Sequence, residues 1–557
     1  METAQRIREA IAKALAGMGL NVPAQDVPLE FPADITHGDF ASGVALARAK
    51  EAGMNPRALA EKLVTLMGSV EGVAEVEIAG PGFINFTLAP EVFAKVIEAA
   101  QAYTWGNGTA EAGKQIIFEY TDPNPFKAFH IGHLMSNAIG ESLSRLAESQ
   151  GANVVRANYQ GDVGVHVACA LWGIRALGIH PESADEFGRA YAVGASAYRE
   201  DPMAKGEIDA INQKLYDRTD PQLNELYDTG RRESLAAFEK IYATLGTKFD
   251  RYYFESETAP IGKEIVLAHP DIFPLSEGAR IFRGEEYGLH TRVFLNAKGI
   301  PTYEAKELGL EKLKQDEYPD AAAFVIITAN EVSDYFRVVK KAMELVYPDI
   351  AKKLRHVAHG MMKLPTGKMS SRTGDVITGE SLLRDLAEAA LERATESRAD
   401  NPKVLAEDVA VGAIKFQVLK QGSAKDIVFD PQQALSLEGD SGPYLQYTYA
   451  RTRAIARKAK DAGIIPKADP TAAPHNTVAR LVARFPSIVE RAAREFAPHH
   501  VAQYLLELAG VFNSWYAQEQ ILDGTPAAAH KLALAGAAGN TIRNGLWLLG
   551  IAAPEKM

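Results

Sequence analysis

Two short stretches of the chain carry residue types that suit phosphate chemistry. The first is His130-Ile131-Gly132-His133, which follows an apolar run at residues 116–118 and opens a helical pattern. The unpaired N–H groups and the positive dipole end of a helix start favour phosphate, and glycine lets a ligand approach the backbone. Two imidazoles can donate hydrogen bonds as charge builds up on phosphate oxygens. Taken alone, this stretch is equally consistent with a histidine-bearing turn that binds nothing.

The second stretch is Lys368-Met369-Ser370-Ser371-Arg372, with Gly367 before it and Gly374 after it. A lysine, two hydroxyls and an arginine within five residues suit a polyphosphate. An exposed basic loop is the alternative, and it would be favoured if the stretch stood alone. The two stretches together favour a nucleotide site.

The elements around the first stretch predict how it is held. Residues 116–118 are typical of a buried strand, and Met135, Ile139, Leu143 and Leu146 recur at helical spacing. A second apolar run begins at Val154. This order of strand, loop, helix and strand is the βαβ unit of a parallel, doubly wound sheet.

The 557 residues are too many for one hydrophobic core, and the pattern divides into three parts. We expect an α+β domain at 1–110, with a hairpin at 73–88. A doubly wound α/β domain follows at 111–385, interrupted by a polar helical insertion at about 180–245. Residues 386–557 are almost wholly helical in pattern and predict an all-α bundle.

The bulk composition excludes some classes of protein. Hydrophobic residues make up 47% and charged residues 24%, which is ordinary for a globular chain. The net charge of −11 neither indicates nor excludes nucleic-acid binding, because local patches govern contact with phosphates. The lone Cys169 allows no intrachain disulfide. No apolar run is long enough for a membrane span or a signal peptide, so a cytoplasmic location is expected.

Together, the two stretches resemble the two signatures of class I aminoacyl-tRNA synthetases. The finer match is to arginyl-tRNA synthetases, because Glu119, Asn124 and Lys127 lead into the first signature as they do in that family. Further segments are also similar to that family, so that the resemblance spans essentially the whole chain: Asn158 to Gly164, Gly412 to Phe416, Tyr444 to Arg451 and Ala553 to Met557.

The resemblance implies a Rossmann-like catalytic domain, an N-terminal domain that binds the tRNA elbow and a C-terminal anticodon-binding bundle. It implies a reaction in two steps. Arginine attacks ATP to form an adenylate and release pyrophosphate, and the aminoacyl group then passes to tRNA(Arg) with release of AMP. ATP would enter with Mg²⁺, without a permanent cofactor or a metal site made by the protein. We expect a monomer that does not bind membranes.

The resemblance also assigns the residues of the ATP site. Catalytic roles fall on His130, His133, Lys127 and Lys368. Contacts to ATP fall on His130, Gly132, His133, Lys368, Met369, Ser370 and Ser371. The general class I loop carries a second lysine where this chain has Ser371, and we expect Lys127 to supply that charge. The alternative is that Lys127 is a solvated loop residue.

A guanidinium group is a rigid fork of donors, so its pocket needs anions and planar acceptors. By resemblance, arginine would be held by Glu119, Asn124, His130, Tyr303, Glu307 and Glu331. Tyr303 and Glu307 share one helix face by their spacing, with an ordinary surface pair as the alternative. Glu307 stands where the family has Asp, and Glu331 where many relatives have Gln.

Contacts to tRNA are expected from two domains. In the helical domain, Tyr447, Arg451 and Met557 match the anticodon pocket of the family, and Trp515 or Tyr516 would complete it. In the N-terminal domain, Phe83 and Asn85 resemble the elbow site. Aromatic side chains stack on unpaired bases and arginines hold phosphates, although each of these residues could instead be a packing residue.

Three other functions stay open. The chain could be another class I synthetase, such as a cysteinyl or glutamyl enzyme, or a small nucleotidyltransferase, which would not need the bundle. It could also be a non-catalytic paralogue that binds tRNA. The presence of His130, His133 and Lys368 argues against the non-catalytic protein.

Overall fold

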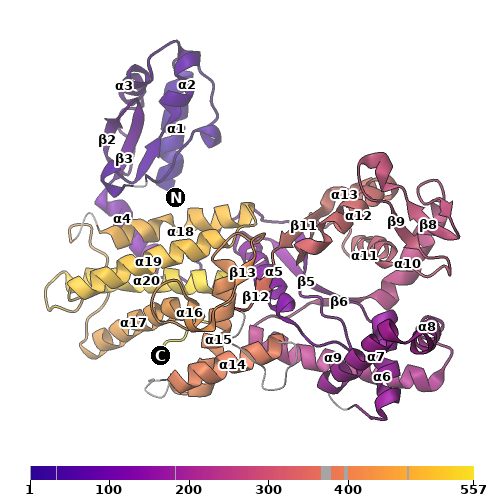
Figure 1. Cartoon of the computed structure of the whole chain (residues 1–557). Coiled ribbons are helices and arrows are strands. Elements are labelled where there is room, and N and C mark those ends of the chain that lie inside the picture. Colours follow the sequence, from indigo (N-terminus) through magenta and orange to yellow (C-terminus); the bar gives the residue numbers. More distant parts are fainter. Residues whose placement is uncertain (1, 33, 182–183, 366–377, 394–398, 473–475) are drawn as a thin grey trace.

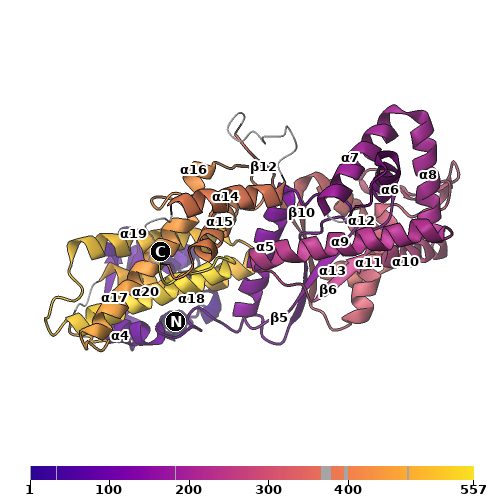
Figure 2. The same cartoon turned by 90° about the horizontal axis from the view of Figure 1, so that it is seen from below.

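A computed structural model describes residues 2–32, 34–181, 184–365, 378–393, 399–472 and 476–557. Three groups of elements are visible in Figure 1: a small N-terminal unit in indigo, a central parallel sheet with its helices, and a set of long helices in orange and yellow. The N-terminal unit and the helices α6 to α8 lie at opposite ends of the molecule in both views (Figures 1 and 2).

The N-terminal unit is a three-stranded antiparallel sheet in the order β1-β3-β2, covered by helices. The hairpin expected at 73–88 is confirmed as β2 and β3, which pair from Val73 to Leu88. Its apolar residues, such as Ile84 and Phe86, are fully buried. The elements are α1 (Glu2–Ala16), β1 (Phe40–Ser42), α2 (Val44–Ala52), α3 (Pro56–Met67), β2 (Val73–Ala79) and β3 (Phe83–Leu88).

The next helix, α4 (Pro90–Ala99), packs on α18 and α20 of the C-terminal bundle. Hydrogen bonds continue this contact, because Gln101 donates to the carbonyl of Ala533 at 2.8 Å and Asn544 donates to that of Trp105 at 2.9 Å. The division expected near residue 110 stays a prediction. In the structure, the segment that leads up to it lies against the bundle.

The central sheet has five parallel strands in the order β11-β10-β4-β5-β6. The predicted βαβ unit is confirmed as β4, α5 and β5. If these five strands are counted from 1 to 5 as they occur along the chain, their order in the sheet is 5-4-1-2-3. The strand order reverses between β4 and β10, as it does in doubly wound sheets. The elements are β4 (Gln115–Glu119), α5 (Ile131–Ser149), β5 (Asn153–Gln160), α6 (Val165–Leu177), β6 (Arg251–Phe254), α10 (Glu255–Ala268), α11 (Tyr303–Glu317), β10 (Ala323–Ala329), α12 (Ser333–Val346), α13 (Pro348–Lys353) and β11 (Leu354–His359).

Two insertions interrupt this sheet. The polar helical insertion is present as α7 (Ala184–Glu200), α8 (Pro202–Asp217) and α9 (Pro221–Leu245). The second insertion contains a separate small sheet, made of β7 (Leu275–Ser276), β8 (Ala279–Phe282) and β9 (Arg292–Leu295). It is antiparallel and packs its own aromatic cluster, in which the ring centroids of Phe273 and Phe294 lie 4.7 Å apart.

The C-terminal part is helical, as expected, apart from a short strand pair. Its β13 (Ile427–Val428) pairs with β12 (Met362–Lys363), which follows the last strand of the central sheet. The helices are α14 (Gly379–Arg393), α15 (Pro402–Leu419), α16 (Pro431–Ala434), α17 (Gly442–Asp461), α18 (Thr477–Arg494), α19 (His499–Gln518) and α20 (Ala528–Leu548). None of the helices within the described ranges is long and apolar enough to cross a membrane.

Candidate active site

The expected phosphate-binding turn lies where ligands bind in doubly wound sheets. The strand order reverses between β4 and β10, and the crevice at the carboxyl ends of such strands is the usual binding site. Glu119 ends β4 at this point, and residues 120–130 connect it to α5. The loop therefore places its side chains at the mouth of the crevice.

The loop backbone is strained. Thr121, Asp122 and Phe126 have φ angles of 80°, 47° and 66°, which side chains with a Cβ rarely adopt. The N–H of Thr121 donates to the hydroxyl of Ser136 at 2.9 Å, and the N–H of Phe126 donates to that of Ser234 at 3.0 Å. Buried partners therefore hold the loop in one conformation before any ligand arrives.

The two histidines of the first signature lie against each other. His130 is the N-cap of α5, and its backbone N–H donates to Nδ1 of His133 at 3.1 Å. Their ring centroids are 3.5 Å apart. Because Nδ1 of His133 accepts, the hydrogen of the neutral ring is on Nε2. Burial, together with the charge of Lys127, lowers the pKa of both imidazoles, so both are neutral donors at pH 7.

Lys127 belongs to the same site. Its side chain is half-buried, and its ammonium lies 4.9 Å from the ring centroid of Tyr191 in α7. Burial lowers the pKa of Lys127, and Glu255 opposes that effect. The structure thus brings a partly desolvated cation to the two histidines, which is where the sequence predicted a compensating charge. The partial burial of Lys127 supports this expectation over a solvated loop residue, and its role in the site stays a prediction.

Glu119 and Asn124 already have partners inside the protein. Glu119 is 3% exposed and is paired with Lys314 of α11, which is fully buried. Asn124 accepts a hydrogen bond from the N–H of Gly161 at 2.9 Å. A Cβ on Gly161 would come within 2.7 Å of that Asn124 oxygen, so a side chain at residue 161 would displace the Asn124 amide. These contacts fix both side chains at the end of β4 and in the loop that follows.

The three other predicted arginine contacts differ in exposure. On α11, Tyr303 is 60% exposed and Glu307 only 5%, so the alternative of an ordinary surface pair is wrong for Glu307. Burial, with Glu119 and Glu311 nearby, raises the pKa of Glu307 well above its usual range. Glu331 is exposed in a short turn that directly follows β10. Tyr303 and Glu307 thus lie on α11, and Glu331 follows the end of β10, one of the two strands between which the strand order reverses.

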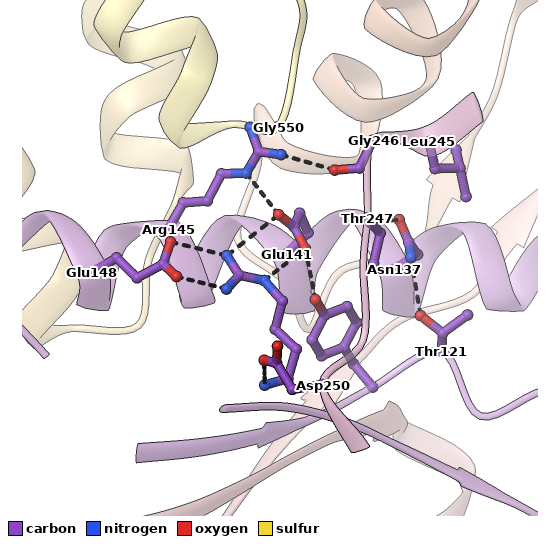
Figure 3. A network of polar contacts seen from close by, with 12 residues as sticks. Thr121, Asn137, Glu141, Arg145, Glu148, Leu245, Gly246, Thr247, Asp250 and Gly550 are labelled. Carbon is purple, nitrogen blue, oxygen red and sulfur yellow. Dashed lines mark hydrogen bonds and ion pairs between the residues drawn. The ribbon is translucent and has the colours of Figure 1, made fainter. Parts of the chain in front are cut away.

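Polar contacts fasten α5, which carries the histidines, to the rest of the chain (Figure 3). The carboxylate of Glu141 accepts from the hydroxyl of Tyr120 at 2.6 Å, from Arg145 at 2.7 Å and from Arg156 at 3.2 Å. Arg145 also donates to the carbonyl of Trp547 at 3.0 Å. α5 is thereby bonded to the C-terminal end of α20 in the bundle.

A buried lysine of α15, Lys415, adds a further positive charge near Glu141. The ammonium of Lys415 donates to the carbonyls of Leu245 and Gly550 at 2.6 and 2.8 Å. Burial lowers the pKa of Lys415 to about 7. Lys415 therefore joins three segments that are distant in the sequence: the end of α9, α15 and the chain after α20.

The second signature cannot be compared with this geometry. Lys368, Met369, Ser370 and Ser371 lie outside the described residues. Their predicted roles stay predictions.

In the bundle, the structure brings together three of the five residues predicted to contact the anticodon. The guanidinium of Arg451 lies 4.9 Å from the ring centroid of Tyr447 and 5.1 Å from that of Tyr516. Both tyrosines are more than a third exposed, at 37% and 39%. Trp515 instead packs edge-on against Phe512, and Met557 is half-exposed near the chain end. The result is an open aromatic and cationic surface on α17 and α19.

The two residues predicted to contact the tRNA elbow differ in how exposed their side chains are. Phe83 is 42% exposed at the start of β3, whereas Asn85 is 6% exposed on the same strand. β3 is the central strand, so Asn85 lies between Ala41 of β1 and Glu77 of β2. Phe83 offers surface for a partner and Asn85 does not.

Reasoning from sequence missed the charged residues that surround Glu119. Glu311 is fully buried, and Lys314 donates to it at 2.6 Å. Asp122 accepts from the N–H of Tyr159 at 2.8 Å. The spacing of Glu307, Glu311 and Lys314 puts them on one helix face, which was the available signal. Because the other faces of α11 also carry charged residues, this spacing does not stand out in the sequence.

The doubly wound sheet, the histidine pair at the start of the first crossover helix and the helical bundle define a class I aminoacyl-tRNA synthetase. Residues 98–431 match the family described as tRNA synthetases class I (R), catalytic domain. Residues 5–88 match the arginyl tRNA synthetase N terminal domain, and residues 445–557 match the DALR anticodon binding domain.

Relatives that match along the whole chain indicate which family of class I synthetases this is. The chain is 30% identical to an arginine--tRNA ligase of Clostridium beijerinckii, with 100% of both chains covered. It is 31% identical to one of Streptococcus suis, with 99% of this chain and 100% of the relative covered. The arginyl-tRNA synthetase of Thermus thermophilus superposes with a TM-score of 0.82 at 26% identity over 99% of each chain. The chain belongs to the arginyl-tRNA synthetase family.

Proposed function

We propose that this protein ligates L-arginine to tRNA(Arg) in two steps, through an arginyl-adenylate formed from ATP, with release of pyrophosphate and AMP. One observation carries the proposal. The loop between β4 and α5 has neutral imidazole donors at one end and a buried carboxylate at the other, at the switch point of the sheet. An anionic nucleotide and a cationic amino acid can therefore meet across a single loop.

On the nucleotide side, His130 and His133 donate to the phosphates of ATP, and Gly132 lets them come close to the helix start. Lys127 adds the charge that the second signature lacks at Ser371. Lys368, Met369, Ser370 and Ser371 hold the pyrophosphate side. ATP enters with Mg²⁺, which neutralises charge on the phosphates. Catalysis then consists mainly of positioning and charge stabilisation.

On the amino-acid side, Glu119 and Asn124 hold the amino end of arginine near His130. Glu307 accepts from the guanidinium group, with Tyr303 at the entrance and Glu331 at the end of β10. The low exposure of Glu307 supports this assignment, because a buried carboxylate needs a cationic partner. A charge-assisted contact of this kind is worth about 1.5–3 kcal/mol, which disfavours the neutral isostere citrulline.

The tRNA spans the outer parts of the chain. Tyr447, Arg451 and Tyr516 bind the anticodon by stacking and charge, with Trp515 and Met557 at the border. The N-terminal unit binds the elbow through Phe83, with Asn85 beneath it. The proposed division into domains at 1–110, 111–385 and 386–557 follows these roles. The protein acts as a monomer in the cytoplasm.

The test is ATP–pyrophosphate exchange with single amino acids, with and without tRNA. Exchange with arginine that depends on tRNA is the expected result, and equal exchange with citrulline would refute the assignment of Glu307. Exchange with a different amino acid would indicate another class I synthetase, which the relatives do not favour. Binding of tRNA without any consumption of ATP would indicate a non-catalytic paralogue.

Two variants test the assigned residues. Lys127→Ala should greatly reduce adenylate formation while arginine binding persists, and normal adenylate formation would show that Lys127 does not supply the missing charge. Tyr447→Ala should weaken tRNA binding with the fold intact. Its matched control is Tyr444→Phe on the same helix, which loses the hydrogen bond from Asn513 and keeps the exposed ring of Tyr447.

A further inference from the structure

A group of buried carboxyls surrounds one lysine beneath the crevice. Glu307, Glu311 and Lys314 follow one another on a single face of α11, opposite Glu119 at the end of β4. Lys314 is fully buried; its ammonium donates to Glu311 at 2.6 Å and pairs with Glu119. Asp122 is the fourth carboxyl, in the strained loop after β4. We call these five residues the acidic cluster.

The acidic cluster is incompletely bonded. Oε1 of Glu307 and Oε2 of Glu311 are buried and have no hydrogen-bond partner within the described part of the chain. Both residues line a cavity of about 370 Å³ between α11, α12 and the sheet. Buried polar atoms are normally paired, so orphaned carboxylate oxygens on residues that line a cavity indicate a missing donor. A guanidinium group, with five N–H donors in one plane, supplies the type of partner that is missing.

The cluster is also unbalanced in charge. Four carboxyls and one ammonium cannot all be ionised at a buried site, because each added negative charge disfavours the next. Burial and Glu119 raise the pKa of Asp122 and of Glu307 well above their usual ranges. Burial, opposed by Lys314, raises the pKa of Glu311 to about 7. Without a ligand the cluster therefore holds protons near neutral pH.

Other titratable groups face Glu307 and Glu311 but do not replace this cation. Burial lowers the pKa of His356 to about 4, so its ring is neutral at pH 7. Lys306 is paired with Glu255 at 2.6 Å. Arg337, Lys340 and Arg355 line the cavity with exposed side chains. The remaining neighbours are the phenols of Tyr159 on β5 and Tyr335 on α12.

We propose that the acidic cluster binds the guanidinium of arginine in exchange for a proton, and that Lys314 is the positioning residue that leaves Glu307 available for it. The proposal rests on the proposed function, since arginine is the cation. Lys314 is bonded to Glu119 and Glu311, and Glu307, which lines the cavity, keeps an oxygen without a hydrogen-bond partner in the described part of the chain. When the guanidinium arrives, a carboxylic O–H gives its proton to solvent and the carboxylate accepts from the guanidinium N–H. One positive charge enters and one leaves.

This exchange fixes the sign of the pH dependence. A bound cation stabilises the ionised carboxyl, so arginine binding releases a proton wherever the free protein still holds it. The affinity for arginine therefore rises with pH, about tenfold per unit for one proton, and levels off above the pH at which the carboxyl ionises in the free protein. The guanidinium of arginine stays charged throughout this range.

The test is calorimetric titration of the full-length protein with L-arginine at pH 6.5, in buffers of different ionisation enthalpy. The slope of the observed heat against the buffer enthalpy counts protons. With a pKa of about 7 for Glu311, we expect about three-quarters of a proton released at pH 6.5, and about a threefold gain in affinity from pH 6.5 to 7.5. Binding with no proton released overturns the inference and leaves the proposed function intact. Absence of arginine binding overturns the proposed function as well.

Variants locate the proton. Glu311→Gln should bind arginine with less than half of the proton release and a flattened pH profile. Asp316→Asn is the matched control, because Asp316 lies exposed on the same helix with Lys312 as its partner, and it should behave as the wild type. Lys314→Gln should move the pH profile to higher pH, and Lys314→Arg should restore it. An unchanged profile in both Glu311→Gln and Lys314→Gln would overturn the roles of these residues.

Discussion

Two buried groups of charged side chains border the active-site loop, and they are built in opposite ways. Around Glu141, one carboxylate meets Arg145, Arg156 and the hydroxyl of Tyr120, and Lys415 is near. In the acidic cluster, four carboxyls share Lys314. Burial alone would raise the pKa of Glu141, but the surrounding cations lower it to about 2. The pKa of Glu311 moves the other way, to about 7.

The difference separates a structural role from a binding role. Both oxygens of Glu141 are bonded, and its partners join α5 to β5 and the bundle, so nothing remains for a ligand to complete (Figure 3). The acidic cluster keeps unpaired oxygens beside a cavity. A buried charged side chain whose partners are all present holds elements together. A buried charged side chain that lacks a partner can bind a ligand of opposite charge. The following variants test that distinction.

Lys314→Met should have the largest effect. It leaves Glu119 and Glu311 without their cation, and removing one partner of a buried ion pair costs about 3–5 kcal/mol. Urea unfolding at pH 8 measures the loss. The loss should shrink at pH 6, because protonated carboxyls do not need the ammonium. Lys312→Met, which changes a partly exposed lysine on the same helix, should stay within about 0.5 kcal/mol of the wild type. Equal losses in the two variants would contradict the central place of Lys314.

Glu141→Gln should cost somewhat less. The lowered pKa of Glu141 corresponds to about 3 kcal/mol of stability at pH 7, present above the unfolded-state pKa and lost as pH falls toward 2. The free-energy difference between variant and wild type should therefore be constant from pH 7 to 5 and shrink below about 4.5. Urea unfolding across that range measures it. A deficit that grows on acidification would show that Glu141 does not act as an anion there.

Glu311→Gln should have the opposite sign. The pKa of Glu311 is raised on folding, so its contribution to stability is present below the unfolded-state pKa and is lost as pH rises through about 7. The amide resembles the protonated carboxyl, so the variant should be more stable than the wild type by about 1–3 kcal/mol at pH 8. At about pH 3.5, below the unfolded-state pKa, the two should be equal. Thermal unfolding at both pH values measures the difference, and a destabilised variant at pH 8 would place Glu311 with Glu141 as a structural anion.

The sequence predicted well the strands and the helix that surround the candidate site. Apolar periodicity predicted β4, α5 and β5, and the short βα connection placed His130 and His133 at the helix start because helix and strand signals bracket them closely. The resemblance to a family supplied Glu119 and Glu307. These features depend on neighbours within one or two turns of the chain, which is what patterns in sequence record.

The sequence could not predict which charges are buried. Glu311 and Lys314 lie in a helix whose charges are typical of a solvated surface, and only packing against β4 encloses them. Glu141 meets Arg156 of β5, and Lys415 of α15 meets the carbonyl of Gly550 after α20, only in the folded chain. The positive φ of Thr121 was equally hidden, because β-branched residues rarely adopt it. Long-range packing decided each of these cases.

Arg156→Lys should have the smallest effect and tests whether geometry or charge holds the Glu141 group together. Arg156 donates to both oxygens of Glu148, at 2.6 and 2.9 Å, while reaching Glu141 at 3.2 Å. A lysine keeps the charge but cannot donate the two parallel hydrogen bonds of the guanidinium group. We therefore expect the free energy of unfolding, measured with urea, to fall by about 1 kcal/mol. Arg145 still faces Glu141, so the acid dependence of stability should keep its wild-type shape. A loss as large as that of Glu141→Gln would mean that the group depends on the hydrogen-bonding fork, and a reduced acid dependence would mean that Arg156, rather than Arg145, sets the low pKa of Glu141.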